Sequence, residues 1–499
     1  MKRMLSLVLS LLLVFSLTAS ALAEDRYLIA GYDNADSNHD WATHPFFQQM
    51  EKLTGVALDV EQYTTKEAWE EAKPLLLNGS KNMPDALFKA ALTTAETEAY
   101  YASGALIDLK PYLSEYAPNL SALLAAHPDW EKAITLPGGA IVALPTINEI
   151  QNNNAAWINT NWLKNVGLSM PTTVEELTEV LRAFKTKDPN RNGRNDETPL
   201  VFTSLWDLRY LAQAFGLISN DYHVRVTDGK VVCTADSDEN YAFLSWLHQL
   251  WEEGLLDPNG FSSTDTMRAV TDSDATITYG IVFGPTSMSM LPSSVTGSYS
   301  VLMPLSVDGE AGKWRAFQSP VVRGTFAITS ACEHPEVLVA WVDTLYSSVG
   351  ERLAQAGVEE EDYFFNADGT WEYIANDETI ANTGLADRII TGGGNMPGLV
   401  TAEFQLLFND DATHRTIAQL HELSLVSEYP FPLIWLSDSD TKTIEDIWND
   451  LGPAMELTMV HFVTGDLPLN ETTWADFTAS IHNGGMDTLI SIWQKAIDQ

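Results

Sequence analysis

Five pieces near the start of the chain decide its fold: RYLIAGY (26–32), PFFQQMEKLT (45–54), GVALDV (55–60), KEAWEEAKPLLLN (66–78) and PDALF (84–88). The first, third and fifth have the length and apolar composition of strands. The second and fourth repeat apolar residues at helical spacing, although Pro74 should kink or break the fourth piece. This β-α-β-α-β order predicts an α/β fold with a parallel sheet covered by helices.

Polar side chains follow the first and last of these predicted strands. Asp33 and Asn34 come directly after one of them, and Lys89 comes directly after the other. Open parallel sheets bind ligands at the carboxyl ends of their strands. We therefore expect Asp33, Asn34 and Lys89 to lie near a ligand.

The chain is long enough for more than one domain, with 499 residues of which 45% are hydrophobic. A second region is predicted to begin near Ile147, where an apolar strand follows a run of asparagines. Asn159 or Asn161 can cap a short helix after that strand. Thr173 and Glu176 have the spacing of a capping box at the start of a longer helix.

The first residues have the pattern of a secretory signal peptide, and we expect residues 1–23 to be removed. Two basic residues precede an apolar run from Met4 to Leu17, which is shorter than the about 20 residues needed to span a membrane. The small-residue pattern of a cleavage site follows at 21–23. The first cysteine is Cys233, so we expect an exported protein, extracellular or periplasmic, that its own signal does not anchor to lipid.

Charge and cysteine content narrow the function further. The formal net charge of -40 repels nucleic acid and anionic membranes, so neither is an expected partner. The only cysteines are Cys233 and Cys332, an even number that permits one disulfide in an exported chain.

The stretch DPNRNGRNDE (188–197) places oxygen-bearing side chains at alternate positions, as a calcium-binding EF-hand loop does. Asp188, Asn190 and Asn192 fit the first three ligand positions, Gly193 the sharp turn, the carbonyl of Arg194 the seventh position and Asp196 the ninth. The twelfth position holds Pro199 instead of glutamate, but Glu197 can supply a carboxylate nearby. We predict a structural Ca²⁺ site, and the alternative is a solvated turn after a helix.

This loop, together with other pieces in the same order, resembles the family 1 extracellular solute-binding proteins of bacterial ABC importers. The similarity is to the large calcium-containing branch that includes alginate-oligosaccharide-binding proteins. The pieces that carry it are GALIDLKPYL (104–113), LPGGAIVALP (136–145), WLKNVGLSMPTT (162–173), LWEEGLLDP (250–258), HPEV (334–337) and FVTGD (462–466). Many Gram-positive relatives have a lipidation cysteine that this chain lacks, and LPGG replaces a more usual Pro-Asp-Gly turn.

The resemblance implies a periplasmic-binding-protein-like α/β fold of two lobes, with hinge crossovers and a ligand cleft between the lobes. Lobe one would hold 24–148 and 318–370, and lobe two 149–317 and 371–499. A bond between cysteines in different lobes would lock the hinge, so two free thiols are expected. The implied metal ligands are Asp188, Asn190, Asn192, the carbonyl of Arg194, Asp196 and Glu197.

Sugars are bound by aromatic faces that cover the C–H groups of a ring and by polar side chains that satisfy its hydroxyls. The chain has 15 tryptophans, and Trp41, Trp206 and Trp435 lie in predicted loops, with Arg209 close after Trp206. For each of these tryptophans, a place in the core is an equal alternative. The family topology also puts candidate ligand-binding residues at strand ends or crossovers: Asn34, Lys89, Glu149, Asn153, Phe283, Arg323 and Asn395.

These features predict a monomeric solute-binding protein that captures an oligosaccharide or other small molecule and delivers it to the permease subunits of an ABC importer. A secreted, calcium-stabilised glycan-active enzyme is one alternative, but with 68 acidic residues a carboxylate pair can always be nominated. The chain has no Gly-x-Ser-x-Gly motif, and His421-Glu422 is not followed by a second zinc-ligand histidine. A receptor of the same fold for a peptide or another non-sugar ligand is the second alternative.

Overall fold

The computed structural model describes residues 26–498, except 34–39, 80–81, 151–153, 263–277, 287–290, 292–294, 296, 307–308, 311, 317–318, 375–388 and 391–394. The predicted signal peptide therefore lies outside the described residues, as do Asn34 and Asn153. The chain divides into two compact units, each built from two separate segments. Unit 1 is Met1–Glu149 with Pro320–Asn409, and unit 2 is Ile150–Ser319 with Asp410–Gln499.

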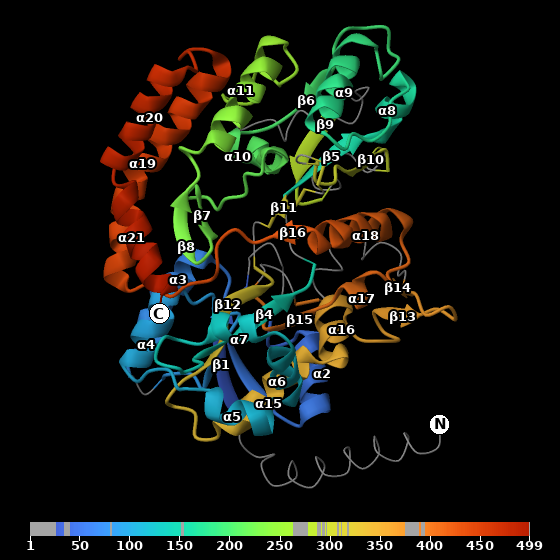
Figure 1. Cartoon of the computed structure of the whole chain (residues 1–499). Coiled ribbons are helices and arrows are strands. Elements are labelled where there is room, and N and C mark those ends of the chain that lie inside the picture. The colour runs from blue at the N-terminus through green and yellow to red at the C-terminus, as the bar shows by residue number, and fades with distance from the viewer. Residues whose placement is uncertain are drawn as a thin grey trace. The chain divides into compact units, whose positions relative to one another are not determined.

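Unit 1 is built on a mixed sheet in the order β15-β4-β12-β3-β1-β2 (Figure 1). The strand β1 lies between β2 and β3 and is parallel to both, so the predicted parallel β-α-β-α-β unit is confirmed. The strand β12 pairs antiparallel with both β3 and β4, and β15 is parallel to β4. The strands are β1 Tyr27–Tyr32, β2 Leu58–Tyr63, β3 Ala86–Phe88, β4 Ala143–Asn148, β12 Val321–Ile328 and β15 Gly398–Val400.

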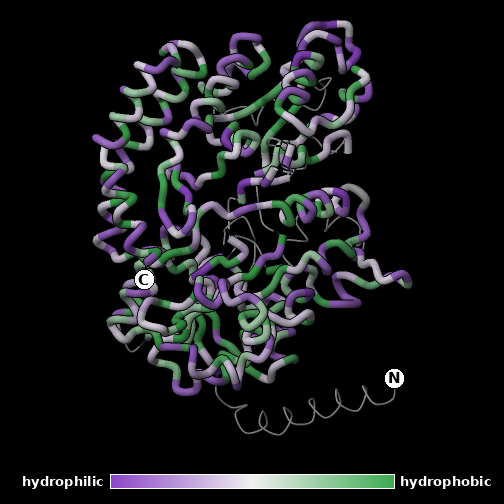
Figure 2. The backbone as a smooth tube through the Cα atoms, in the orientation of Figure 1, coloured by the Kyte–Doolittle hydropathy of each residue, from purple (hydrophilic) through white to green (hydrophobic). Residues whose placement is uncertain are grey.

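Helices cover this sheet, and the apolar residues concentrate along its strands (Figure 2). The helix predicted over 45–54 is α2, Pro45–Thr54. The helix predicted over 66–78 is α3, Lys66–Leu76, which continues through Pro74 because this residue falls in its last turn and removes only one hydrogen bond. The other helices of unit 1 are α4 Thr94–Ala102, α5 Lys110–Tyr116, α6 Pro118–Ala126, α7 Pro128–Ile134, α15 Pro335–Asp343, η3 Thr344–Tyr346, α16 Ser348–Ala356 and α17 Ala402–Gln405.

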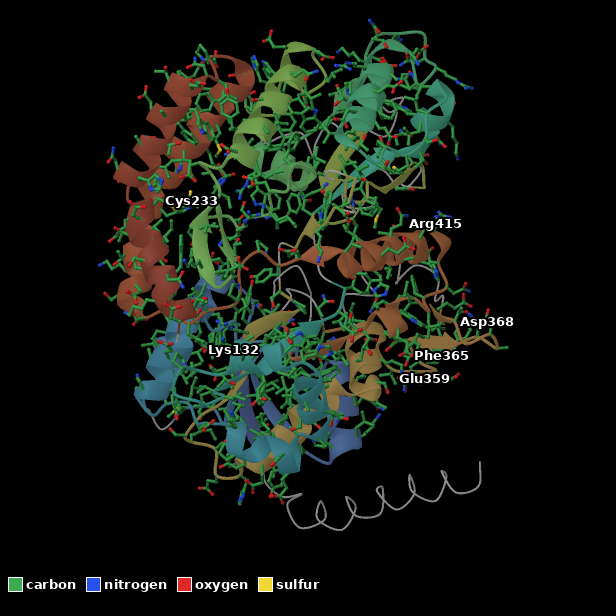
Figure 3. All side chains as sticks on the ribbon, viewed as in Figure 1. Lys132, Cys233, Glu359, Phe365, Asp368 and Arg415 are labelled. Carbon is green, nitrogen blue, oxygen red and sulfur yellow. The ribbon has the colours of Figure 1, made fainter. Side chains whose placement is uncertain are left out.

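The described residues between 371 and 409 belong to unit 1, although the expected lobe bounds put them in the second lobe. The hairpin of β13 (Tyr363–Phe365) and β14 (Trp371–Tyr373) carries an aromatic cluster in which Trp371 stacks on Phe404 at 4.8 Å between ring centroids. In Figure 3, Phe365 and Asp368 mark this hairpin. Long-range contacts that join this segment to unit 1 include the aromatic cluster and the pairing of β15 with β4.

Unit 2 has a smaller sheet in the order β10-β5-β9-β6, with only β6 and β9 parallel. The long helix α19 packs against α11, α20 and α21, and α21 packs against β8 (Figure 1). The strands are β5 Ala155–Asn159, β6 Thr198–Leu200, β7 Val224–Thr227, β8 Lys230–Cys233, β9 Tyr279–Gly284, β10 Tyr299–Val301, β11 Trp314–Arg315 and β16 Ser427–Glu428. The helices are α8 Thr160–Val166, α9 Val174–Thr186, α10 Leu205–Leu208, η2 Arg209–Phe215, α11 Asp238–Glu252, α18 Asp411–Leu425, α19 Asp438–Thr464, α20 Glu471–Asn483 and α21 Met486–Ile497.

The two helices predicted in unit 2, α8 and α9, begin at the predicted capping residues. Asn159 caps α8, because its side chain accepts hydrogen bonds from the backbone N–H groups of Asn161 and Trp162. Thr173 caps α9 by accepting from the backbone N–H of Glu176 at 3.1 Å. The full capping box is absent, because Glu176 accepts from Thr172 instead of Thr173. Among the described residues, no helix combines the length and apolar character required to cross a bilayer.

Candidate functional site

The predicted calcium loop lies in unit 2 between α9 and β6, and its backbone turns sharply. Asp188, Arg191 and Gly193 all have positive φ angles, of 45°, 57° and 74°. The Asp188 carboxylate accepts hydrogen bonds from the backbone N–H groups of Asn192 and Gly193 at 3.1 and 3.0 Å. The oxygens of Asp196 accept from the amide groups of Asn190 and Asn192. These hydrogen bonds bring the side chains of Asp188, Asn190, Asn192 and Asp196 together in one tight turn.

Glu197 provides the test of whether a metal fits this loop. Its side chain is buried, and neither carboxylate oxygen has a hydrogen-bond partner among the described residues. Burial, with added repulsion from Asp196 and Asp188, raises the pKa of Glu197. A buried carboxylate without a partner is costly and is relieved by a cation, so the donor set fits Ca²⁺. In the described part of the chain, however, no three His, Cys, Asp or Glu side chains are already arranged as a metal site.

In unit 1, Trp41 and Lys89 converge on the carboxylate of Asp33 at the end of β1. The indole N–H of Trp41 donates to Asp33 Oδ2 at 2.9 Å, and Lys89 Nζ donates to Asp33 Oδ1 at 2.6 Å. Lys89 also donates to the carbonyl of Ile390 at 3.0 Å. Burial lowers the pKa of Lys89 despite the attraction of Asp33. The backbones of β1 and β3 approach each other so closely here that a Cβ atom at Gly31 would lie 1.6 Å from the carbonyl oxygen of Phe88.

This environment makes Trp41 a core residue, which was one of the two equal alternatives for it, and not a candidate ligand platform in this structure. Its exposed fraction is 0%, and its ring packs against Phe47 and Phe88. Lys89 is 1% exposed and its charge is balanced by Asp33. Both residues lie where a ligand could approach a parallel sheet, but in this structure they fasten the strand ends together.

The other candidates of unit 1 lie around β4, β12 and β15. Glu149 is exposed directly after β4, and its Oε2 accepts from the backbone N–H of Ala402 at 3.2 Å. Nearby, buried Glu351 accepts from the hydroxyl of Thr401 at 2.8 Å, and burial raises the pKa of Glu351. Arg323 on β12 and Asn395 before β15 are both half-buried.

In unit 2, Trp206 belongs to a cluster around Arg315, and Arg209 lies close enough to Arg315 for the two charges to repel each other. The guanidinium of Arg315 lies 5.9 Å from the ring centroid of Trp206 and 5.2 Å from that of Tyr210. Arg315 also pairs with the carboxylate of Asp221, which accepts the indole N–H of Trp206 at 2.8 Å. We call these four residues, Trp206, Tyr210, Asp221 and Arg315, the arginine–aromatic cluster. The two other candidates that the structure describes in this unit lie on different elements: Phe283 is buried on β9, and Trp435 is half-buried after β16.

A second layer of charged residues supports this cluster from inside. Arg209 is buried and donates to the hydroxyl of Ser219 at 3.1 Å. Burial, together with repulsion from Arg315, lowers the pKa of Arg209 to about 9. Burial and the neighbouring arginines lower the pKa of His223 to about 4, so this ring is neutral at pH 7. The carboxylate of Glu456 lies 3.9 Å from His223, and that histidine is the main cause that keeps the pKa of Glu456 below its usual value.

The sequence nominated Trp206 and Arg209 as candidates but gave no reason to name Asp221, Tyr210 or Arg315. The five come from three separate stretches, and no spacing in the sequence links them. Asp221 is one of 68 acidic residues and lies in a turn without a motif. The expected free thiols agree with the structure, in which Cys233 and Cys332 are unbonded and belong to different units. Burial raises the pKa of each thiol to about 12.

Comparison with known proteins identifies relatives along almost the whole chain. The fructooligosaccharide ABC transporter substrate-binding protein FusA of Streptococcus pneumoniae is 29% identical over 489 residues, covering 91% of this chain and 86% of FusA. The structure of FusA in complex with kestose matches with a TM-score of 0.70 at 25% identity, covering 95% of this chain and 99% of the other. A second FusA structure, an EF-hand mutant in complex with fructo-nystose, matches with a TM-score of 0.69 at 24% identity, covering 95% and 99%.

Two more distant structures share the fold. A solute-binding protein of Bifidobacterium longum infantis, described as binding HMO, has a TM-score of 0.77 at 19% identity and covers 95% of this chain and 98% of its own. The alginate-binding protein AlgQ2 has a TM-score of 0.64 at 17% identity, covering 96% and 99%. These matches confirm the predicted fold class. The family model for bacterial extracellular solute-binding proteins matches residues 35–351, more than half of the chain, so this protein belongs to that family.

Proposed function

We propose that this protein captures an oligosaccharide outside the cell and delivers it to the permease of an ABC importer. The observation that carries the proposal is the similarity to FusA over 91% of the chain, because FusA is a fructooligosaccharide ABC transporter substrate-binding protein. The arginine–aromatic cluster supports it, since Trp206 and Asp221 combine an apolar ring with a hydrogen-bond acceptor for hydroxyls. The protein acts as a receptor and not as an enzyme, as its family does.

The loop 188–197 holds Ca²⁺ in this proposal. The ligands are Asp188, Asn190, Asn192, the carbonyl of Arg194, Asp196 and Glu197. Support comes from the burial of both Glu197 oxygens without partners and from the EF-hand that a FusA mutant alters. The ion supplies positive charge that offsets the three carboxylates, and the residues bind it to fix the connection from α9 to β6.

The remaining parts of the proposal concern location and assembly. Residues 1–23 act as a cleaved signal peptide, so the mature chain begins at Glu24 and carries no lipid from that signal. The mature protein works as a monomer beside its permease subunits. Mass spectrometry of the secreted protein, together with light scattering, tests these points.

The decisive experiment is titration calorimetry of the mature protein against a panel of oligosaccharides chosen by thermal-shift screening. We expect a Kd of about 1 µM or lower, which corresponds to about -8 kcal/mol. Mass spectrometry should recover the ligand intact after long incubation. Cleavage of any glycan would instead support the secreted-enzyme alternative, and binding of peptides without sugars would support a non-sugar receptor.

A further inference from the structure

The loop 188–197 contains an asparagine followed directly by a glycine, Asn192–Gly193, and such a pair is chemically labile. The backbone nitrogen of the glycine can attack the side-chain amide carbon of the asparagine, because glycine places no side chain in the way. The sequence has four of these pairs, at 78–79, 192–193, 259–260 and 483–484. The first borders residues that lie outside the described ones, so the comparison below uses the other three.

Side chains of the loop hold the reacting groups of Asn192–Gly193, which lie outside any helix or strand. The backbone N–H of Gly193 donates to Asp188 Oδ2 at 3.0 Å. The side-chain amide of Asn192 donates to the Asp196 carboxylate at 3.0 and 3.1 Å, and its oxygen accepts from the backbone N–H of Arg194 at 2.7 Å. Attack requires that the nitrogen of Gly193 lose its proton and that the amide of Asn192 turn toward it. The loop therefore protects this pair only while these hydrogen bonds last.

The forces that keep the loop closed without a metal are weak. Gly193 and Asp196 are exposed, so water competes for their hydrogen bonds. Asp188 and Asp196 repel the buried carboxylate of Glu197, whose oxygens have no hydrogen-bond partner among the described residues. A bound cation offsets that repulsion, so Ca²⁺ should favour the closed loop and its removal should favour local opening.

Two other pairs are held by backbone hydrogen bonds and serve as internal references. The N–H of Gly260 donates to the carbonyl of Asp257 at 3.1 Å, and a Cβ atom on Gly260 would lie 2.4 Å from the ring of Phe202. The N–H of Gly484 donates to the carbonyl of Ser480 at 2.8 Å, at the end of α20. Neither pair belongs to the loop 188–197, so calcium should not change how often they open.

We propose that Asn192 is a deamidation site whose reaction requires opening of the calcium loop, so that Ca²⁺ suppresses it. The nitrogen of Gly193 forms a bond to Cγ of Asn192, and the side-chain amide group leaves as ammonia with the proton from that nitrogen, which gives a cyclic imide. Water then opens the imide at either carbonyl, and the product is aspartate or isoaspartate. The inference rests on the calcium site proposed above and adds a covalent control of that site.

The two products change the loop in different ways. Aspartate at position 192 keeps an oxygen donor in place and adds a negative charge, so calcium binding should be kept. Isoaspartate sends the main chain through Cγ, which inserts one more carbon before the turn at Gly193 and disrupts the alternate spacing of the donors. The fraction of protein that no longer binds calcium should therefore grow with the time that the protein spends without the ion.

The test follows deamidation of the mature protein in chelator, in excess Ca²⁺ and in denaturant. Cleavage after lysine places the three pairs in separate peptides, and fragmentation mass spectrometry assigns the modified residue; the peptides are 188–230, 231–313 and 443–495. In chelator, Asn192 should convert at least about 10-fold faster than in calcium at about 100 times its Kd, because binding at that level lowers the opened population by about 100-fold. Asn259 and Asn483 should convert at rates that calcium leaves unchanged. In denaturant, all three should convert at similar rates.

Asn192→Ser is the matched control, because serine keeps an oxygen at this ligand position but cannot form the imide. This variant should lose the calcium-dependent change in the peptide 188–230. If the variant fails to fold, Asn259 and Asn483 of the native chain still provide the reference rates.

The possible results separate the modification from the calcium site. Equal conversion of Asn192 in chelator and in calcium, while calcium still raises the Tm, would overturn the proposal and leave the calcium site intact. Conversion of Asn192 in chelator that is no faster than that of Asn259 and Asn483 would also overturn it. Absence of any calcium effect on both the Tm and the conversion would overturn the calcium site as well. Oligosaccharide titrations test the receptor function independently of all these results.

Discussion

Calcium should stabilise this protein through the buried carboxylate of Glu197. Both oxygens of that carboxylate lack hydrogen bonds among the described residues, and an unsatisfied buried group costs about 1–3 kcal/mol, or more when charged. Calcium at 100 times its Kd stabilises the folded state by about 2.7 kcal/mol. At roughly 2–4 °C per kcal/mol for a domain of this size class, the expected rise in Tm between chelator and excess Ca²⁺ is roughly 5–10 °C.

The pH dependence of this effect has a definite sign. The pKa of Glu197 is raised in the folded state, so ionisation is unfavourable there compared with the unfolded chain. In chelator, Glu197 does not destabilise the protein below the pKa that this residue has in the unfolded chain. The destabilisation grows as the pH rises from that value to the higher pKa of the folded state. In calcium, protons compete with the ion, so the stabilisation should weaken as the pH falls through the same folded pKa.

Scanning calorimetry of three proteins, with chelator and with calcium between pH 4 and 8, provides the assay. Glu197→Gln should be more stable than the native protein in chelator at pH 7 and should lose most of the calcium-induced shift. Asn195→Ala changes an exposed residue of the same loop that is not a proposed ligand, so it should keep the full shift. The reasoning fails if calcium leaves the native Tm unchanged, or if Glu197→Gln and the native protein respond equally.

Three other predictions test the fold. Thr173→Ala removes the N-cap of α9 and should lower the free energy of unfolding by about 1 kcal/mol in urea titrations, whereas an unchanged midpoint would contradict the cap. Gly31→Ala would press a methyl group against the carbonyl of Phe88, so we expect a loss of about 3 kcal/mol or failure to fold, and native-like stability would refute that contact. Hydrogen bonds to Asp236 and Asp487 raise the pKa of His482 in the folded protein. The stabilisation by protonated His482 is therefore complete below pH about 6.5, and it is lost as the pH rises through the pKa of the folded state. The difference in stability between the native protein and His482→Asn should therefore shrink as the pH rises, and a difference independent of pH would contradict the assignment.

The parts of the fold that the sequence predicted well are local ones. The first three strands of unit 1 follow each other within residues 27–88, so alternating patterns in one window identify them. The strand β15 shows the limit, because it has three residues and pairs with β4 about 250 residues earlier. No local pattern encodes such a pairing, and the same lack explains why the expected lobe bounds differ from the bounds of the compact units between 371 and 409.

The same limit applies to the candidate site residues, because only those that a local sequence pattern defines could be predicted. The calcium loop could be proposed because its donors lie within ten consecutive positions whose spacing has chemical meaning. The sequence could not distinguish Trp41 from Trp206, since both lie in predicted loops, yet Trp41 is fully buried and Trp206 is partly exposed. Asp221 and Arg315 could not be predicted as candidates, because their interaction joins positions that are 94 residues apart in the chain.

The division of each unit into two segments has a consequence for how the chain must mature. During synthesis, β3 and β4 exist long before β12 emerges to lie between them, and β4 waits longer still for β15. Until then, these apolar strands present unpaired edges, which are prone to associate with other chains. Neither unit can finish folding from an early portion of the polypeptide, because unit 1 needs residues up to Asn409 and unit 2 needs the helices at the carboxyl terminus. We therefore expect slow, cooperative acquisition of the native state after export, and no stable fragment from a chain truncated at Ser319.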